Sequence, residues 1–317
     1  MIDALELAVP EHACRRQELW ANSPARRIRS KQFYLWQVDF RPKLRLIVYY
    51  GHGHPIPKKD RHYKLQFVNT ATLTEDDFTH QVGQLFLLTE SEICSLKVMR
   101  VDFAVNVRSV SVQWFRETCV VRCKQTYEEI RRWDECTSPG YTSLKIGKRP
   151  DLYRIYDKVD EIKHRTGHFA HMGQITGKPE PTITRVERQC SAGRVPREFQ
   201  TLDGLLKGAA EFDPFSCLTF AKAKVAPDTQ KWKPQKWLMS LGLKAAVKEH
   251  GLQVVRARLD RNKGTATRCF KRYSDLLNSN MDGPTSRKLR ELYQESIAFQ
   301  LNQAKNGRRP RGILMDL

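Results

Sequence analysis

The sequence predicts an α+β protein, with an antiparallel sheet and helices in residues 1–213 followed by a smaller basic helical domain in residues 214–317. Two observations support this. Segments with alternating apolar residues, typical of strands, are concentrated in the first two-thirds of the chain. Beyond about Asp213 the apolar spacing becomes helical, and lysine and arginine become frequent. Antiparallel strands with intervening helices are typical of α+β domains.

The composition is that of a soluble globular protein, with 40% hydrophobic and 28% charged residues in 317. A chain of this length can bury a sizeable core. No run of 18 apolar residues is present that could span a membrane. The first residues, Met1 to Glu6, lack the basic and apolar segments of a signal peptide. We therefore expect a cytoplasmic protein.

The net charge of +20 is distributed unevenly along the chain. From Ala221 to Leu317 there are 21 Lys+Arg against 8 Asp+Glu, so 13 of the 20 excess charges lie in the last 97 residues. Such a positive field attracts a polyanion, and nucleic acid is the usual one. An anionic membrane is the alternative partner, but no strongly apolar amphipathic face accompanies the charge.

Alternation predicts strands at 43–50 and 63–67, and most clearly at 97–108. In the third segment, one face holds only apolar residues: Met99, Val101, Phe103, Val105 and Val107. The other face carries Arg100, Asp102, Ala104, Asn106 and Arg108. This pattern predicts a half-buried strand that presents a polar surface to solvent.

Further along, residues 111–133 mix aromatic, aliphatic and charged residues and predict a helix. Residues 141–158 predict a hairpin of two strands around a turn at 147–151. The stretch 163–181 is rich in Gly, His and Pro and predicts a loop. A strand follows at 182–190, so three polar-faced strands precede the basic C-terminal region.

The C-terminal region predicts helices at 237–250 and 252–260 on either side of Gly251, and at 265–277. Two helices joined by a glycine turn on a basic surface permit a helix-turn-helix-like DNA reader. Any small helical bundle has the same pattern, so this interpretation stays open. Residues 307–311 predict a basic tail.

The second hairpin strand contains a candidate nucleophile, Tyr156. The period of two places it on one face with Arg154 and Lys158, while Tyr153 points to the other face, toward packing. A phenol has a pKa of about 10 and is a poor nucleophile at neutral pH. Nearby cations favour the phenolate and also hold a phosphodiester beside it. The alternative is that Tyr156 is an ordinary strand aromatic.

Two carboxylates on the other polar strands indicate a metal site. Asp102 lies on the polar face of 97–108, and Glu187 projects with Arg185 from 182–190. Two carboxylates on adjacent strands form a hard-oxygen site for Mg²⁺ or Mn²⁺. Such a metal would polarise a phosphate oxygen during attack by a tyrosine. Alternatively, each carboxylate is a solvated strand residue or an ion-pair partner.

Three segments, Val98–Val105, Tyr153–Lys158 and Thr184–Arg188, resemble in order the motifs of the replication initiation factor family. That family includes initiators of rolling-circle plasmids and of filamentous-type phages. The opening Met1–Pro10 also resembles the start of filamentous-phage replication endonucleases. The resemblance covers roughly residues 1 to 210.

The resemblance implies a metal-dependent DNA nicking and joining enzyme with a palm-like sheet. Tyr156 then corresponds to the tyrosine that forms a 5′-phosphotyrosine and leaves a 3′-OH primer. Asp102 and Glu187 correspond to the acidic positions that hold Mg²⁺ or Mn²⁺. Asn106 stands where the family often has a second aspartate, and its carbonyl oxygen could complete the metal site, or the side chain could merely fill space.

The expected partner is origin DNA, single-stranded or in a hairpin at the nick and duplex nearby. We expect Arg154 and Lys158 to neutralise the scissile phosphate, with Tyr153 beside the nucleophile. The residues expected to contact DNA are Lys145, Lys148, Arg149, Arg185, Arg256, Arg258, Lys271 and Arg272. A host helicase is a further expected partner, and a homodimer is left open.

Other residues with metal-like spacing have simpler interpretations. Cys119, Cys123 and Cys136 raise the question of a zinc site, but no second pair follows at finger spacing, so buried thiols are favoured. His52-Gly53-His54 is followed by prolines and indicates a turn, not a metal-binding pair in a sheet. The loop histidines, His164, His168 and His171, favour DNA contact or no function over a metal site.

The competing function is a DNA-binding initiator or repressor without catalysis. The same positive charge would serve such a protein. Three polar-faced strands that bring together a tyrosine, cations and carboxylates are not needed for binding alone, and they favour the enzyme.

Overall fold

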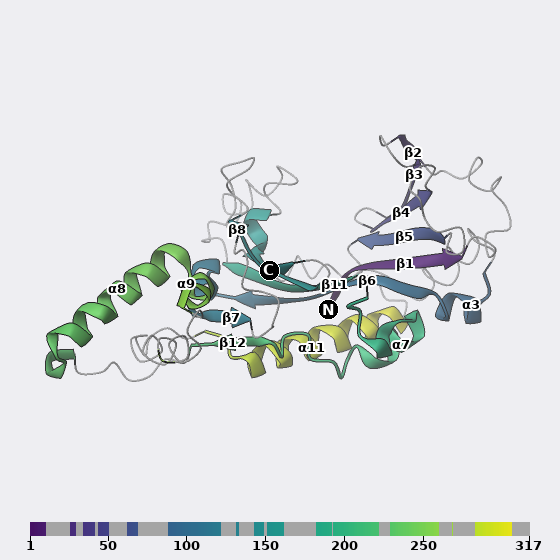
Figure 1. Ribbon diagram of the computed structural model, residues 1–317. Helices are drawn as coiled ribbons and strands as arrows, with labels where there is room; N and C mark the ends of the chain where they lie inside the picture. Colours follow the sequence, from purple (N-terminus) through teal and green to yellow (C-terminus); the bar gives the residue numbers. More distant parts are fainter. Residues whose placement is uncertain are drawn as a thin grey trace, which may run out of the picture. The chain divides into compact units, whose positions relative to one another are not determined.

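The computed structural model describes residues 1–10, 26–29, 34–41, 44–50, 62–68, 88–121, 131–132, 143–148, 151–161, 182–191, 193–221, 229–259, 268 and 283–305 (Figure 1). By their contacts the residues form two compact units. Unit 1 comprises Met1–Ala104, Gln189–Phe212 and Tyr293–Leu317, and unit 2 comprises Val105–Arg188 and Asp213–Leu292.

Unit 1 is built on an antiparallel sheet whose strand order is β2-β3-β4-β5-β1-β6. The strands are β1 (Ile2–Pro10), β2 (Arg26–Arg29), β3 (Tyr34–Arg41), β4 (Leu44–Tyr50), β5 (His62–Val68) and β6 (Lys97–Arg108). The predicted strands at 43–50, 63–67 and 97–108 are confirmed. β1 lies between β5 and β6, with Leu7 opposite Leu65 and Leu5 opposite Val101.

Aromatic side chains form the core of unit 1 beneath β6. The ring centroid of Phe103 lies 6.1 Å from the ring centroid of Phe199, 5.1 Å from that of Phe212 and 6.0 Å from that of Tyr293. The short helices α3 (Glu90–Cys94), η6 (Arg197–Phe199) and α7 (Leu202–Gly208) belong to this unit. In Figure 1, α7 lies with the last part of α11 (Ser286–Lys305) on one side of β1 and β6.

Helix α11 was not predicted from the sequence, and its second part packs against β1 and the residues around Ala209. The Tyr293 hydroxyl donates to the carbonyl oxygen of Ala209 at 2.9 Å. The side-chain amide of Gln300 pairs with both backbone groups of Ile2, at 2.8 and 3.1 Å. The two units differ from the predicted domains 1–213 and 214–317, because Val105–Arg188 groups with Asp213–Leu292, and the second part of α11 belongs to unit 1.

Unit 2 contains the second part of β6 and the strand order β6-β11-β10-β9-β8. Its strands are β7 (Cys119–Val121), β8 (Arg131–Arg132), β9 (Ser143–Lys148), β10 (Asp151–Asp157), β11 (Ile183–Ser191, as far as Arg188) and β12 (Leu218–Phe220). The predicted hairpin is confirmed, since β9 and β10 pair from Asp151 opposite Lys148 to Tyr156 opposite Ser143. The predicted strand at 182–190 is confirmed as β11.

The predicted helix at 111–133 is confirmed at Val112–Thr118 and wrong at residues 119–121 and 131–132, which are strands; residues 122–130 and 133 lie outside the described residues. Helix α4 (Val112–Thr118) ends because Cys119 takes an extended backbone, with φ −90° and ψ 137°. Residues 119–121 instead form β7, which pairs with β12. Val120 and Val121 are β-branched and buried, so strand pairing and burial outweigh the helical pattern around them.

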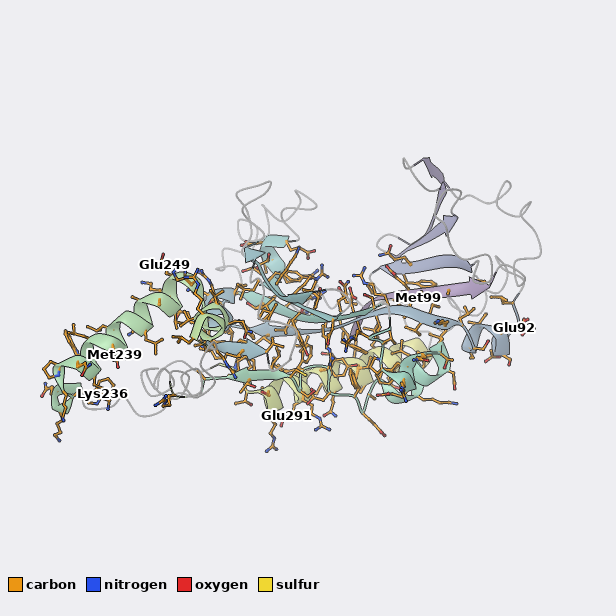
Figure 2. All side chains as sticks on the ribbon, viewed as in Figure 1. Glu92, Met99, Lys236, Met239, Glu249 and Glu291 are labelled. Atoms are coloured by element: carbon orange, nitrogen blue, oxygen red, sulfur yellow. The ribbon has the colours of Figure 1, made fainter. Side chains whose placement is uncertain are left out.

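Helices α8 (Pro234–His250) and α9 (Leu252–Leu259) confirm two predicted helices, and Gly251 joins them with φ +81°. Their shared core consists of Val120, Ala221, Val247, Leu252 and Val255. Lys236 and Met239 lie toward the N-terminal end of α8 and Glu249 toward the other end (Figure 2). The predicted helix at 265–277, apart from Arg268, and the tail at 307–311 lie outside the described residues.

None of the helices in the described ranges is long and apolar enough to cross a membrane.

Candidate active site

In unit 2, Tyr156 on β10 and Glu187 on β11 are joined by a hydrogen bond. The Tyr156 hydroxyl donates to Oε1 of Glu187, while Arg154 donates from Nη2 to Oε2 of the same carboxylate. Glu187 is 0% exposed and Tyr156 is 6% exposed. A buried carboxylate is costly unless it is paired and hydrogen-bonded, and here one oxygen is bound by a cation and the other by the phenol.

Two cations also lie over the ring of Tyr156. The guanidinium carbon of Arg154 is 5.9 Å from the ring centroid, and the Lys158 ammonium nitrogen is 5.8 Å from it. Lys158 comes directly after β10 and pairs with Glu161 at 2.6 Å. The alternation in β10 thus places Arg154 and Tyr156 on the same face, as predicted, and Lys158 approaches from the residues that follow the strand.

Tyr153 lies on the other face of β10, also as predicted. It is buried, and its hydroxyl donates to the carbonyl oxygen of Pro214 at 3.1 Å. The guanidinium carbon of Arg188 lies 5.6 Å from its ring centroid. Burial raises the pKa of Tyr153 well above its usual value, although the nearby Arg188 acts in the opposite direction. Tyr153 is therefore packed and hydrogen-bonded inside the fold, on the face of β10 opposite Tyr156.

In unit 1, Asp102 on β6 forms a two-pronged ion pair with Arg100. Arg100 donates from Nε to Oδ1 at 2.9 Å and from Nη2 to Oδ2 at 2.5 Å. Its remaining nitrogen, Nη1, reaches Oε1 of Glu6 at 3.3 Å. The side-chain amide of Gln189 lies within 3.4 Å of both Asp102 oxygens. Asp102 is consequently enclosed by polar partners and is only 1% exposed.

The predicted solvent exposure of Asp102 and Glu187 is wrong. Alternation identifies which residues share a face, but it does not reveal whether other parts of the chain cover that face. Both carboxylates are buried, and each is balanced by an arginine, two residues away on the same strand for Asp102 and on the neighbouring strand for Glu187. Their removal will therefore cost stability as well as any activity.

All three predicted metal ligands accept a hydrogen bond from an arginine. Arg100 binds Asp102, Arg154 binds Glu187, and Nε of Arg185 donates to Oδ1 of Asn106 at 2.8 Å. A divalent cation would need these same oxygens. Within the described ranges, no group of three or more His, Cys, Asp or Glu side chains is arranged to hold a metal ion. As arranged here, the described residues do not form a divalent-metal site.

The predicted DNA contacts are only partly within the described residues. Lys145 lies on β9 opposite Arg154 and is half-buried, and Lys148 ends the same strand. On α9, Arg256 is half-buried and Arg258 is exposed. Arg185 lies on β11, where it is buried against Asn106. Arg149, Lys271 and Arg272 lie outside the described residues, so these three stay predictions.

The alternative metal residues are also only partly described. Cys119 is buried, and burial raises the pKa of its thiol above the usual range, which favours a neutral thiol inside the fold. Cys119 forms no disulfide with any described cysteine. The other candidate ligands lie outside the described residues: Cys123, Cys136, His52, His54, His164, His168 and His171.

Sequence reasoning missed Ser143, which lies directly opposite Tyr156 in the β9–β10 hairpin. The signal was present in the spacing. Lys148 pairs with Asp151, and counting outward along the two strands from that pair brings Ser143 opposite Tyr156. The predicted turn at 147–151 was too wide to set this register.

A comparison with solved structures matched a rolling circle replication initiator protein from Geobacillus stearothermophilus. The match has 15% sequence identity and a TM-score of 0.37, and it covers 77% of this chain and 95% of that chain. No family model matches this chain, and neither does any curated protein. We therefore argue function from this chain's own residues.

Proposed function

We propose that this protein cuts one DNA strand with Tyr156 and keeps the new 5′ end attached to it, as an initiator of rolling-circle replication. One observation carries the proposal: the Tyr156 hydroxyl donates to the buried carboxylate of Glu187 while Arg154 and Lys158 lie over its ring. A tyrosine with both a proton acceptor and cations beside it is suited to attack a phosphodiester. The net charge of +20 and the three ordered sequence motifs support DNA as the substrate.

In the proposed reaction, Oε1 of Glu187 accepts the phenolic proton as the Tyr156 oxygen attacks phosphorus. The bond from phosphorus to the 3′ oxygen breaks, and that oxygen takes a proton from solvent. The products are a 5′-phosphotyrosine and a free 3′-OH, which a polymerase can extend. Attack by a 3′-OH on the phosphotyrosine reverses these steps, rejoins the strand and releases Tyr156.

Arg154 and Lys158 would stabilise the negative charge that develops on the phosphate oxygens. Preorganised cations of this kind are among the strongest contributors to catalysis. Arg154 is already held by Glu187, so its position does not depend on substrate. Lys158 is likewise held by Glu161 at 2.6 Å.

Origin DNA is the proposed partner, single-stranded or in a hairpin at the nick and duplex nearby. The exposed Arg258 on α9 and the basic residues after Ala221 would bind the duplex part. A host helicase and a homodimer stay predictions.

The metal, Mg²⁺ or Mn²⁺, also stays a prediction of the sequence resemblance, since the described carboxylates are bound to arginines. Nicking measured with Mg²⁺, with Mn²⁺ and with excess chelator tests it. Full activity in chelator would contradict a metal role for Asp102, Asn106 and Glu187.

The proposed function is tested by incubating the protein with supercoiled and single-stranded DNA of its own replicon, followed by denaturing electrophoresis and peptide mass spectrometry. We expect an open-circular product and a DNA fragment covalently bound to the peptide that contains Tyr156. Binding without any covalent product would instead favour the non-catalytic initiator or repressor.

A further inference from the structure

Ser143 is a buried hydroxyl at the start of β9. It is 5% exposed, and its Oγ has no hydrogen-bond partner in the part of the chain that the structure describes. Buried polar groups in folded proteins nearly always have a partner, because an unsatisfied one destabilises the fold. An exception therefore needs an explanation, and a bound ligand is one.

The position of Ser143 indicates which ligand that would be. Ser143 is opposite Tyr156 and Lys145 is opposite Arg154 in the antiparallel register. Directly opposite residues of an antiparallel pair lie on the same face, with Cβ atoms about 4.5–5.5 Å apart. The hydroxyl therefore lies on the face that carries the proposed nucleophile and two cationic side chains.

We propose that Ser143 binds one non-bridging oxygen of the scissile phosphodiester, next to the Tyr156 hydroxyl that attacks it. The Ser143 hydroxyl donates to that oxygen, and Arg154 and Lys145 supply the positive charge that holds it. The DNA phosphate then supplies the partner that none of the described residues gives to Ser143. This inference rests on the proposed function and adds the subsite that fixes the phosphate before attack.

The test combines two measurements on Ser143→Ala: its melting temperature without DNA, which should not fall, and its affinity for DNA, which should. Without DNA, Ser143→Ala should melt at the same temperature as the parent or higher, because the removed hydroxyl has no partner among the residues that the structure describes. With DNA, the same change should weaken binding by about tenfold, as expected for removal of a hydrogen bond to a charged group. A residue that serves only the fold would not produce this pair of results.

Binding is measured in the Tyr156→Phe background, so that the oligonucleotide is not cut. The probe is a single strand spanning the nick site that wild-type protein reveals, with a phosphodiester or with either stereoisomer of methylphosphonate at the scissile position. We expect Ser143→Ala to weaken phosphodiester binding, and to have no effect on the isomer that lacks the oxygen bound by Ser143.

Thr184→Val is the matched control. It also removes a buried hydroxyl, but that hydroxyl donates to the carbonyl oxygen of Val110 at 2.6 Å. This variant should melt at a lower temperature and should reduce binding to all three probes equally or not at all.

Three results would overturn the subsite. One is an unchanged affinity of Ser143→Ala for the phosphodiester when wild-type protein forms the Tyr156 adduct, which leaves the proposed function intact. The second is a lower melting temperature for Ser143→Ala, because the hydroxyl would then have a partner within the protein. The third is the lack of any adduct with wild-type protein, in which case the proposed function fails together with the subsite.

Discussion

Tyr156 donates its hydroxyl hydrogen to Glu187, and both side chains are buried in the sheet of unit 2. The second oxygen of Glu187 accepts from Arg154, so a single carboxylate positions both the proposed nucleophile and a cation that would stabilise the phosphate. The proposed catalysis and the fold would therefore depend on the same group. Variants at this site need a stability measurement beside every activity measurement.

Replacement of Tyr156 by phenylalanine should abolish the covalent DNA adduct while DNA binding survives, because only the nucleophilic oxygen is removed. Tyr153→Phe is the matched control on the opposite face of β10. It should retain most cleavage and lose about 1 kcal/mol of stability, since it removes the hydrogen bond to Pro214. Adduct formation is measured by denaturing electrophoresis and stability by urea unfolding. An adduct on Tyr153 would show that the assignment of the two faces is wrong.

Removal of the Glu187 carboxylate should reduce both nicking and stability. Glu187→Ala removes the buried carboxylate that binds both Arg154 and the Tyr156 hydroxyl, and the loss of one partner of a buried ion pair costs about 3 kcal/mol of unfolding free energy. Glu187→Gln retains hydrogen-bonding capacity and shape, so it should be more stable than the alanine variant. Both should nick roughly a hundredfold more slowly or worse, because neither can accept the phenolic proton. A fully stable, fully active Glu187→Gln protein would contradict this role.

The Arg100–Asp102 pair in unit 1 should behave as an energetically coupled unit. Asp102→Ala should cost about 3 kcal/mol, because it leaves Arg100 without its two-pronged partner. If Arg100 is then replaced by methionine, this second substitution should cost less than it does in the wild-type protein, since its ion pair with Asp102 is already lost and only its contact with Glu6 remains. A double-mutant cycle by urea unfolding measures the coupling. Additive effects of the two substitutions would mean that the ion pair contributes nothing to the fold.

The basic surface of α8 and α9 should determine the salt dependence of duplex binding. Deletion from Ala221 cannot test this cleanly, because it also removes Tyr293 and Gln300 from unit 1. Substitution of the exposed Lys244, Lys248 and Arg258 by glutamine removes charge alone. The slope of log K against log salt should fall by about 0.9 for each phosphate that the variant no longer neutralises.

Nicking of a short single-stranded oligonucleotide by this triple variant should change little, since its site keeps its own cations. Lys207→Gln is the control, because Lys207 is an exposed lysine of unit 1 that pairs with Asp203 at 2.9 Å. The control should leave the slope unchanged. An equal slope for the triple variant and the wild-type protein would show that α8 and α9 do not bind the duplex.

The sequence alone determined the strands β4, β5, β6 and β11, the β9–β10 hairpin and the face on which each side chain of β10 lies. Alternation with a period of two is a local property of the backbone, so it placed Arg154 beside Tyr156 and sent Tyr153 to the other face. Net charge is likewise a sum over residues, so the preference for a polyanion needed no structure.

Only the tertiary structure decided what surrounds those faces. Contacts between distant segments bury Asp102 and Glu187 and pair Glu187 with Arg154. Such contacts also end α4 at Thr118 and pack α11 on the first strand. Periodicity carries no information about such contacts, because it repeats over two to four residues. The pairing of Ser143 with Tyr156 lies between these cases. It follows from the local spacing of residues, but only if the pair of residues that closes the hairpin, Lys148 and Asp151, is known.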